Sequence, residues 1–112
     1  MGKSSKTKYY QNLAQEKLGK AEYLYAGNLE GNWDAEIIIL CYHALLYYVF
    51  AQGYNDFSAL PDSSSKSDFM RVESIYLELQ EPFLSFNPFR VGEAISITRR
   101  YLNKIEKHIK DH

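Results

Sequence analysis

The chain has little of what stabilises or anchors many small proteins. Among its 112 residues there is one cysteine, Cys41, and there are three prolines. A single thiol excludes an internal disulfide and leaves no cysteine pair for a structural zinc ion. No uninterrupted apolar run reaches the about 18 residues that a membrane-spanning helix needs, and no secretory leader is recognisable. We therefore expect a cytoplasmic protein that is not bound to a membrane.

The short motifs that mark common catalytic and cofactor sites are also missing. The sequence has no phosphate-binding glycine loop, no Gly-x-Ser-x-Gly elbow and no Glu-x-x-His spacing of the kind that di-iron bundles use. Two of its three histidines, His108 and His112, fall in the last turns of the chain, where exposure or the helix dipole explains them. We expect neither a metal ion nor an organic cofactor.

Apolar and aromatic residues, in contrast, are abundant. They include ten tyrosines and six phenylalanines, and 46% of the chain is apolar, which excludes a disordered protein. The length fits one domain over residues 1–112, with residues 1–6 as a flexible basic tail. The formal net charge of −1 gives no global reason to bind nucleic acid, and the lysines near both ends of the chain are read as solvated helix faces.

Apolar residues recur at three- and four-residue steps along four segments, which predicts an all-α fold, an antiparallel four-helix bundle. The predicted helices cover about residues 7–29, 33–53, 68–81 and 92–112, the last beginning at Gly92 or Glu93. Asn32 is placed to cap the second helix, and Gly53 is a natural left-handed stop for it. Residues 54–65 form the main loop, and Pro82 closes the third helix.

The second helix is apolar on nearly every side, so we expect it to lie at the centre of the bundle. The buried side of the third helix consists of Phe69, Val72, Tyr76 and Leu79. The inner stripe of the fourth helix consists of Ala94, Thr98, Tyr101, Leu102, Ile105 and Ile109. The phenylalanine-rich connection at residues 83–89 should pack against the bundle.

The second helix also carries a polar strip. Glu36, His43 and Tyr47 lie at i, i+7 and i+11, which places them within roughly 40° of one another around the helix, with Leu40 between them. Such a strip can be a proton-transfer or ligand-binding site, or it can be an interface or a hydrogen-bonded feature of the core. We favour the interface or core interpretation. Cys41 points to a different side of the helix from His43 and is expected to be a buried structural thiol.

Four sequence features together resemble those of the HEPN domain, a small all-α module of prokaryotic defence and toxin–antitoxin systems. They are AEYL at residues 21–24, WDAE at residues 33–36, CYHALLYYV at residues 41–49 and RRYLNKIE at residues 99–106. Residues 42–47 follow the family pattern "aromatic-aromatic-Ala-x-x-His", with His43 in an aromatic position and Tyr47 in the usual histidine position. The resemblance implies a helical bundle that serves as a ribonuclease toxin or as its partner subunit.

The sequence departs from the nuclease members of that family at the catalytic motif. Those members carry an arginine followed by four to six residues and a histidine, whereas none of Arg71, Arg90, Arg99 and Arg100 has a histidine at that spacing. Without this pair there is no evident group to activate a ribose hydroxyl or to stabilise the phosphate. We therefore expect a catalytically inactive HEPN-like interaction module, either a homodimer or a subunit of a defence or toxin–antitoxin type complex.

Two alternatives remain open. The chain is either a divergent metal-independent HEPN ribonuclease, with Arg71 or Arg90 contacting phosphate and His43 or Tyr47 in support, or a helical adaptor unrelated to the family. RNA as a partner has no supporting motif. The residues expected at an interface or ligand site are Glu36, His43, Tyr47, Phe83, Phe86 and Phe89.

Overall fold

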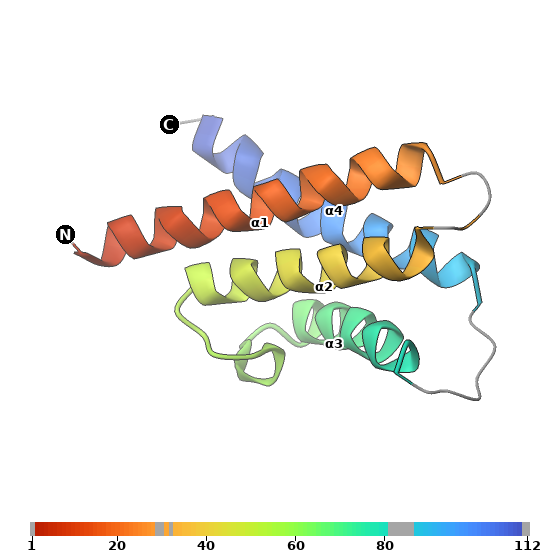
Figure 1. Cartoon of the computed structure of the whole chain (residues 1–112). Coiled ribbons are helices and arrows are strands. Elements are labelled where there is room, and N and C mark those ends of the chain that lie inside the picture. Colours follow the sequence, from red (N-terminus) through yellow and green to blue (C-terminus); the bar gives the residue numbers. More distant parts are fainter. Residues whose placement is uncertain (1, 29–30, 32, 81–86, 111–112) are drawn as a thin grey trace.

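The computed structural model describes residues 2–28, 31, 33–80 and 87–110, with side chains described between residues 6 and 103 of these ranges. This part of the chain is helical throughout apart from its connections. The elements are α1 (Gly2–Ala26), α2 (Asp34–Ala51), the short 3-10 helix η1 (Phe57–Ala59), α3 (Ser63–Glu78) and α4 (Phe89–Lys110). In Figure 1, α1 and α2 form an antiparallel pair, α4 lies behind them and α3 lies below α2. The predicted all-α helical bundle is confirmed.

The first helix is longer at its start and shorter at its end than the sequence indicated. It begins at Gly2 instead of residue 7, so it includes residues 2–6 of the expected basic tail, and it ends at Ala26 instead of residue 29. Asn28 closes the turn to the second helix. Its Oδ1 accepts a hydrogen bond from the Trp33 amide (2.9 Å), and its Nδ2 donates to the Asp34 carboxylate (2.6 Å). The predicted cap, Asn32, lies outside the described residues.

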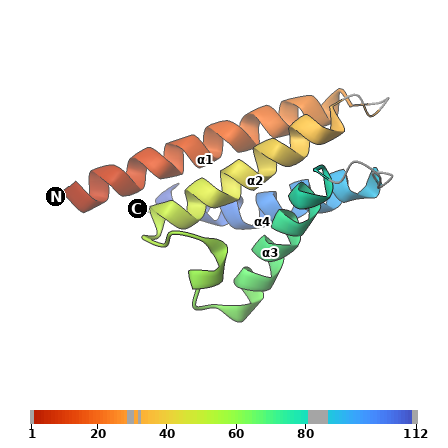
Figure 2. The ribbon, with the colours of Figure 1, turned by 60° about the horizontal axis from the view of Figure 1, so that its bottom comes forward.

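The second helix occupies the centre of the fold, as predicted. It packs against α1, α3 and α4, and Figure 2 shows α1 and α3 on opposite sides of it. Its fully buried side chains are Ile37, Ile38, Cys41, Ala44, Leu45 and Val49. The helix ends at Ala51, and Gly53 follows with a φ of 92°, its amide donating to the Phe50 carbonyl (2.9 Å). The predicted left-handed stop at Gly53 is confirmed.

The predicted loop over residues 54–65 is correct only in part, because this segment also contains η1 and the start of α3. The third helix begins at Ser63, five residues before the predicted start at Asp68. Asp62 caps it, since its Oδ2 accepts hydrogen bonds from the Ser65 amide (2.9 Å) and the Ser65 hydroxyl (2.7 Å). The helix ends at Glu78, and Pro82 lies outside the described residues.

The predicted buried side of α3 is half correct. Phe69 and Val72 are fully buried, and so is Ile75, which does not belong to the predicted set. Tyr76 and Leu79 are only partly buried and pack against the edge of the core. Tyr76 stacks on Tyr42 of α2 with ring centroids 4.1 Å apart, so its position is fixed by an aromatic contact rather than by burial.

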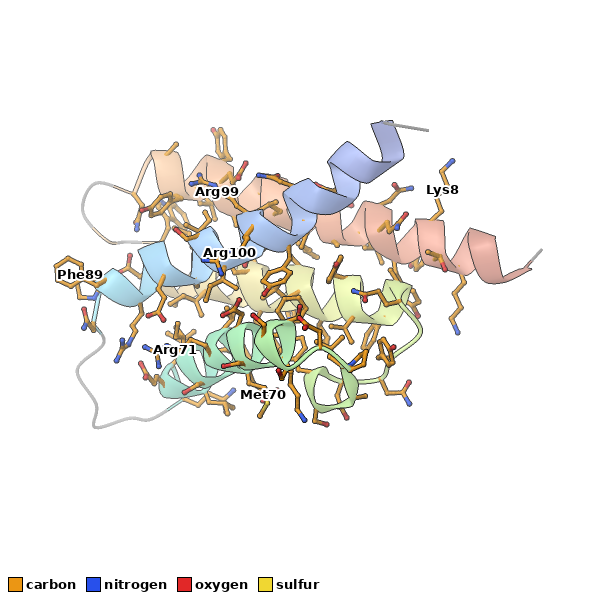
Figure 3. All side chains as sticks on the ribbon, turned by 180° about the vertical axis from the view of Figure 1, so that it is seen from behind. Lys8, Met70, Arg71, Phe89, Arg99 and Arg100 are labelled. Atoms are coloured by element: carbon orange, nitrogen blue, oxygen red, sulfur yellow. The ribbon has the colours of Figure 1, made fainter. Side chains whose placement is uncertain are left out.

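The fourth helix begins at Phe89, three residues before the predicted start, because the Oδ1 of Asn87 accepts a hydrogen bond from the Phe89 amide (2.9 Å) and Pro88 suits a first turn. The Phe89 side chain is 84% exposed and points away from the bundle (Figure 3), so the expected packing of this aromatic is wrong. Phe83 and Phe86 lie outside the described residues. The buried members of the predicted inner stripe are Ala94, Thr98, Tyr101 and Leu102, while Ile105 and Ile109 are beyond the described side chains.

Leu45 tests the central position of α2, because its side chain is fully buried in a helix that packs against α1, α3 and α4. Replacing it with alanine should lower the free energy of unfolding by about 2–5 kcal/mol, since the cavity cannot collapse fully. Urea denaturation would measure this loss. Leu77→Ala on α3 is the control, because Leu77 is 51% exposed and its loss should change stability by less than about 1 kcal/mol. A Leu45→Ala loss as small as that of the control would contradict the central placement.

Candidate functional site

One side of α2 is less deeply buried than the others. On this side lie Glu36, Ile39, His43, Leu46 and Phe50, which we call the outer seam. Glu36 is exposed and the other four are only partly buried. The steps between them are three, four, three and four residues, the spacing of a helix that packs lengthwise against another helix. The opposite side of α2 carries Cys41, which meets Thr98 of α4.

The helix that carries the outer seam is very apolar, yet much of it is not buried. Among the described helices only α2 is long and apolar enough to cross a membrane by length and composition, a property that core helices of soluble proteins share. Only 44% of α2 is buried within the protein, however. Large apolar side chains left in contact with water favour association.

The first helix extends this surface sideways. A row of its residues follows the same alternation of four and three residues, namely Lys6, Tyr10, Leu13, Lys17, Lys20 and Leu24. Lys6 and Tyr10 line the same hollow as Phe50, and Lys17, Lys20 and Leu24 line the same groove as Glu36. Tyr10 stacks on Tyr47 of α2 (ring centroids 6.1 Å apart) and meets Phe50 edge-on (5.5 Å). We call the outer seam together with this row of α1 residues the α1–α2 face.

The structure places Glu36 and His43 in the outer seam and Tyr47 at its edge, against the Tyr10 ring of α1, so the predicted polar strip is spread along the α1–α2 face rather than gathered at one point. Glu36 lines a groove with Lys17 and Lys20 of α1, while Tyr47 lies against the Tyr10 ring near the other end. At 1.5 Å per residue, the strip spans about 16 Å along the helix axis. The three side chains therefore suit contacts with an extended surface better than the binding of one small group.

His43 lies in the middle of the outer seam. Partial burial lowers the pKa of its imidazole from the ordinary value, and the positive charge of Lys17 on α1 lowers it further. The ring also lies beside Tyr42, with centroids 5.7 Å apart. A depressed pKa keeps the imidazole neutral at pH 7, which is compatible with burial in an apolar interface.

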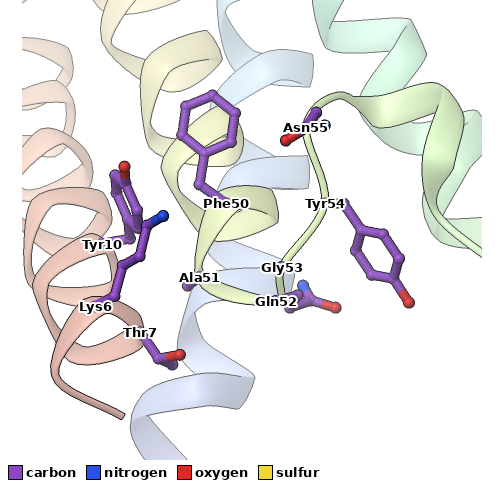
Figure 4. Close-up of a pocket in the computed structure, with 9 residues that line it drawn as sticks. All are labelled: Lys6, Thr7, Tyr10, Phe50, Ala51, Gln52, Gly53, Tyr54 and Asn55. Atoms are coloured by element: carbon purple, nitrogen blue, oxygen red, sulfur yellow. The ribbon is translucent and has the colours of Figure 1, made fainter. Parts of the chain in front are cut away.

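A hollow opens at the end of the α1–α2 face where α1 begins and α2 ends. It has a volume of about 310 Å³. Figure 4 shows Lys6 and Tyr10 of α1 on one side of it and Phe50 with the segment leading to Tyr54 and Asn55 on the other. Aromatic rings and one ammonium group thus line the same space. A second, more open groove of about 630 Å³ lies nearer the start of α2, where Glu36 and Leu40 meet α1.

The two arginines considered for phosphate contact are both held by carboxylates. Arg71 of α3 donates two hydrogen bonds to Glu93 of α4, with Nε–Oε2 and Nη2–Oε1 distances of 2.6 and 3.1 Å. These bonds lower the pKa of the Glu93 carboxyl from its ordinary value. Arg90 lies 3.5 Å from the Glu78 carboxylate and 3.6 Å from that of Glu93. The Arg90 Nε is buried without a hydrogen bond, so its contact with Glu78 is electrostatic.

Two further arginines of α4 also hold the bundle together, and Figure 3 labels both. Arg99 donates to the Glu22 carboxylate of α1 (2.7 Å), and its guanidinium lies 5.8 Å from the centre of the Tyr25 ring. Arg100 donates to Asp68 of α3 (3.1 Å), which also accepts a hydrogen bond from a tyrosine hydroxyl of α4. These contacts give the positive charge in the middle of α4 a structural role.

The structure separates the groups that a ribonuclease would have to bring together. His43 lies in the outer seam and Tyr47 lies against α1, whereas Arg71 and Arg90 pair with carboxylates between α3 and α4. Among the described side chains, no three of the His, Cys, Asp and Glu type lie close enough to hold a metal ion. His108 and His112 are beyond the described side chains.

Comparison with models of protein families, with curated proteins and with solved structures gives no match for this chain. The resemblance to HEPN domains therefore depends on the sequence features alone. The fold and the surface themselves define a class of protein, a four-helix bundle with one less deeply buried helix-hairpin face. Sequence reasoning missed Ile39, Leu46 and Phe50 as members of that face, although their three- and four-residue spacing was visible.

The buried state of Cys41 generates a prediction. Burial raises the pKa of its thiol to about 12, despite a hydrogen bond with Thr98 that acts in the opposite direction. In the folded protein at pH 8, Cys41 should react with Ellman's reagent more than about 100-fold more slowly than in the chain unfolded by guanidinium, because almost no thiolate is present. Ser96→Cys, which adds a thiol at an exposed position of α4, is the control and should react at once. Rapid labelling of Cys41 itself would show that it is accessible.

Proposed function

We propose that this protein is a HEPN-like interaction module without ribonuclease activity, which acts as a homodimer or as one subunit of a defence or toxin–antitoxin type complex. One observation carries the proposal. The most apolar of the described helices leaves Ile39, Leu46 and Phe50 only partly buried along a single regular seam. Burial of such a seam against another protein is favourable in proportion to the apolar area removed from water.

The size of the α1–α2 face supports the same proposal. Along α2 the face extends about 27 Å, and across two helices it extends about 20 Å. This footprint is on the scale of a standard interface, which buries roughly 800 Å² of accessible surface on each partner. Most homo-oligomers have two-fold symmetry, so a second copy of the same face is the simplest partner.

The ribonuclease alternative has weaker support. A phosphate at Arg71 or Arg90 would have to displace Glu93 or Glu78, which already neutralise both guanidinium groups. His43 lies in the outer seam and Tyr47 lies against α1 instead, so they are not placed to act on a phosphate held there. The defence or toxin–antitoxin context comes from the resemblance, and an adjacent gene of the nucleotidyltransferase type would be the observation that favours it.

The proposal predicts the mass of the protein in solution. Light scattering should report about twice the 13.0 kDa chain mass at micromolar concentration. Tyr47→Glu should shift the protein toward monomer with an unchanged helical circular-dichroism signal, because it buries a charge in the interface. Ser96→Glu on the exposed side of α4 is the matched control and should remain dimeric. A wild-type chain that stays monomeric at high concentration would remove the homodimer and leave only a different partner subunit.

The proposal also predicts a lack of nuclease activity. Purified protein should not cleave single-stranded RNA or tRNA above background, with or without added divalent metal, because no described histidine and arginine side chains converge. Gel electrophoresis of labelled RNA would measure this. Cleavage that disappears in Arg90→Ala or His43→Ala would overturn the inactive assignment and support the ribonuclease instead.

A further inference from the structure

The outer seam is symmetric about one residue. His43 stands at its centre. Ile39 and Glu36 precede it by four and seven residues, and Leu46 and Phe50 follow it by three and seven residues. A second copy packed antiparallel along this seam, with the two-fold axis beside His43, would set apolar residues against apolar residues. Phe50 at one end would then meet the position of Glu36 in the other copy.

The same arrangement brings two features outside the seam together. Trp33 precedes His43 by ten residues and Gly53 follows it by ten, so each lies about 15 Å from the axis along the helix direction. Antiparallel pairing about His43 therefore places Trp33 of one copy at the level of Gly53 in the other. Gly53 belongs to the wall of the 310 Å³ hollow shown in Figure 4.

The chemistry of the hollow fits an indole ring. Its walls include the rings of Tyr10 and Phe50, and aromatic rings pack well against one another in edge-on or offset arrangements. The ammonium group of Lys6 at its rim can lie over the face of a tryptophan. Trp33 is the single tryptophan of the chain, and it is 48% exposed at the start of α2.

Charges at the two ends of the face are complementary in this arrangement. Lys6 is at the end where α2 finishes, and Glu36 is in the first turn of α2. Neither of them has an ion-pair partner among the described residues. The antiparallel pairing places Glu36 of one copy beside Phe50 of the other copy, close to Lys6 of that other copy. The two-fold symmetry repeats this contact between Glu36 and Lys6 at the opposite end of the interface.

We propose that this hollow is the receptor for Trp33 of a second copy, in an antiparallel dimer whose two-fold axis passes beside His43. The inference rests on the proposed homodimer and adds the register of the two copies to it. Each copy contributes one tryptophan and one hollow, so the interface has two identical anchoring points about 30 Å apart with the apolar seam between them.

Cross-linking tests the position of the axis. A residue beside a two-fold axis lies near its own copy, so His43→Cys should form a disulfide-linked dimer on mild oxidation. Wild-type protein, in which Cys41 is buried, and Ser96→Cys, with its thiol on α4, are the controls and should stay uncross-linked. If His43→Cys does not cross-link, or if Ser96→Cys cross-links equally well, the antiparallel register with its axis beside His43 is overturned.

Trp33 itself gives a second, independent test. Trp33→Ala should weaken the dimer at least tenfold in Kd, measured by dilution in analytical ultracentrifugation, whereas Tyr23→Ala should not change it. Tyr23 is the matched control, because it is an aromatic residue 81% exposed on α1. Fluorescence of Trp33 should move to shorter wavelength in the dimer compared with the monomeric Tyr47→Glu variant. If the wild type is a stable dimer, if Trp33→Ala dimerises with the same Kd and if the fluorescence does not shift, the proposed seat of Trp33 is overturned while the homodimer stands. A monomeric wild type overturns both the homodimer and the seat of Trp33.

Discussion

Burial of the inner side of α2 against three other helices is the constraint on which the rest of the structure depends. Ala14 and Ala21 of α1 and Ala44 of α2 are fully buried, and such small side chains allow these two helices to approach closely. On the other side of α2, the rings of Tyr42 and Tyr76 stack, and Cys41 lies against α4. Because α1 and α3 lie on opposite sides of α2 and α4 lies against the side of Cys41, the outer seam is the least covered side of the helix. The candidate site is thus a consequence of the packing.

The sequence predicts the helices well because each is long enough for its apolar period to be visible. The starts of α3 and α4 were wrong for a physical reason. Each depends on the hydrogen bonds of one capping side chain, Asp62 or Asn87, and the residues that follow Asp62 are serines, which favour loops as readily as helix starts. The spacing of apolar residues shows where a helix has a buried side, but it does not show at which residue a capping hydrogen bond starts the helix. The core of α4 was predicted only in part, because Val91, Ile95 and Ile97 are also buried and broaden the inner side of the helix beyond the predicted stripe.

The candidate site was only partly predictable. The angular positions of Glu36, His43 and Tyr47 drew attention to one side of α2, since polar residues on an apolar helix are conspicuous. Ile39 and Leu46 were not identified, because a helix that is apolar all round gives no sign of which side is least covered. The pairing of Arg71 with Glu93 was also beyond the sequence, since the two residues are 22 positions apart and meet only after α3 and α4 have packed.

Polar residues in an apolar seam need a reason, because their burial opposes association. In the proposed dimer they restrict the ways in which two seams can meet. Apolar residues at three- and four-residue steps would pack almost equally well if one copy slid by a helical turn, whereas a neutral His43 and the opposite charges of Lys6 and Glu36 fit one register only. The apolar residues of the seam then supply most of the affinity, while the polar residues determine the alignment. A depressed His43 pKa is consistent with this division, because an imidazole that stays neutral can enter the interface without bringing a charge with it.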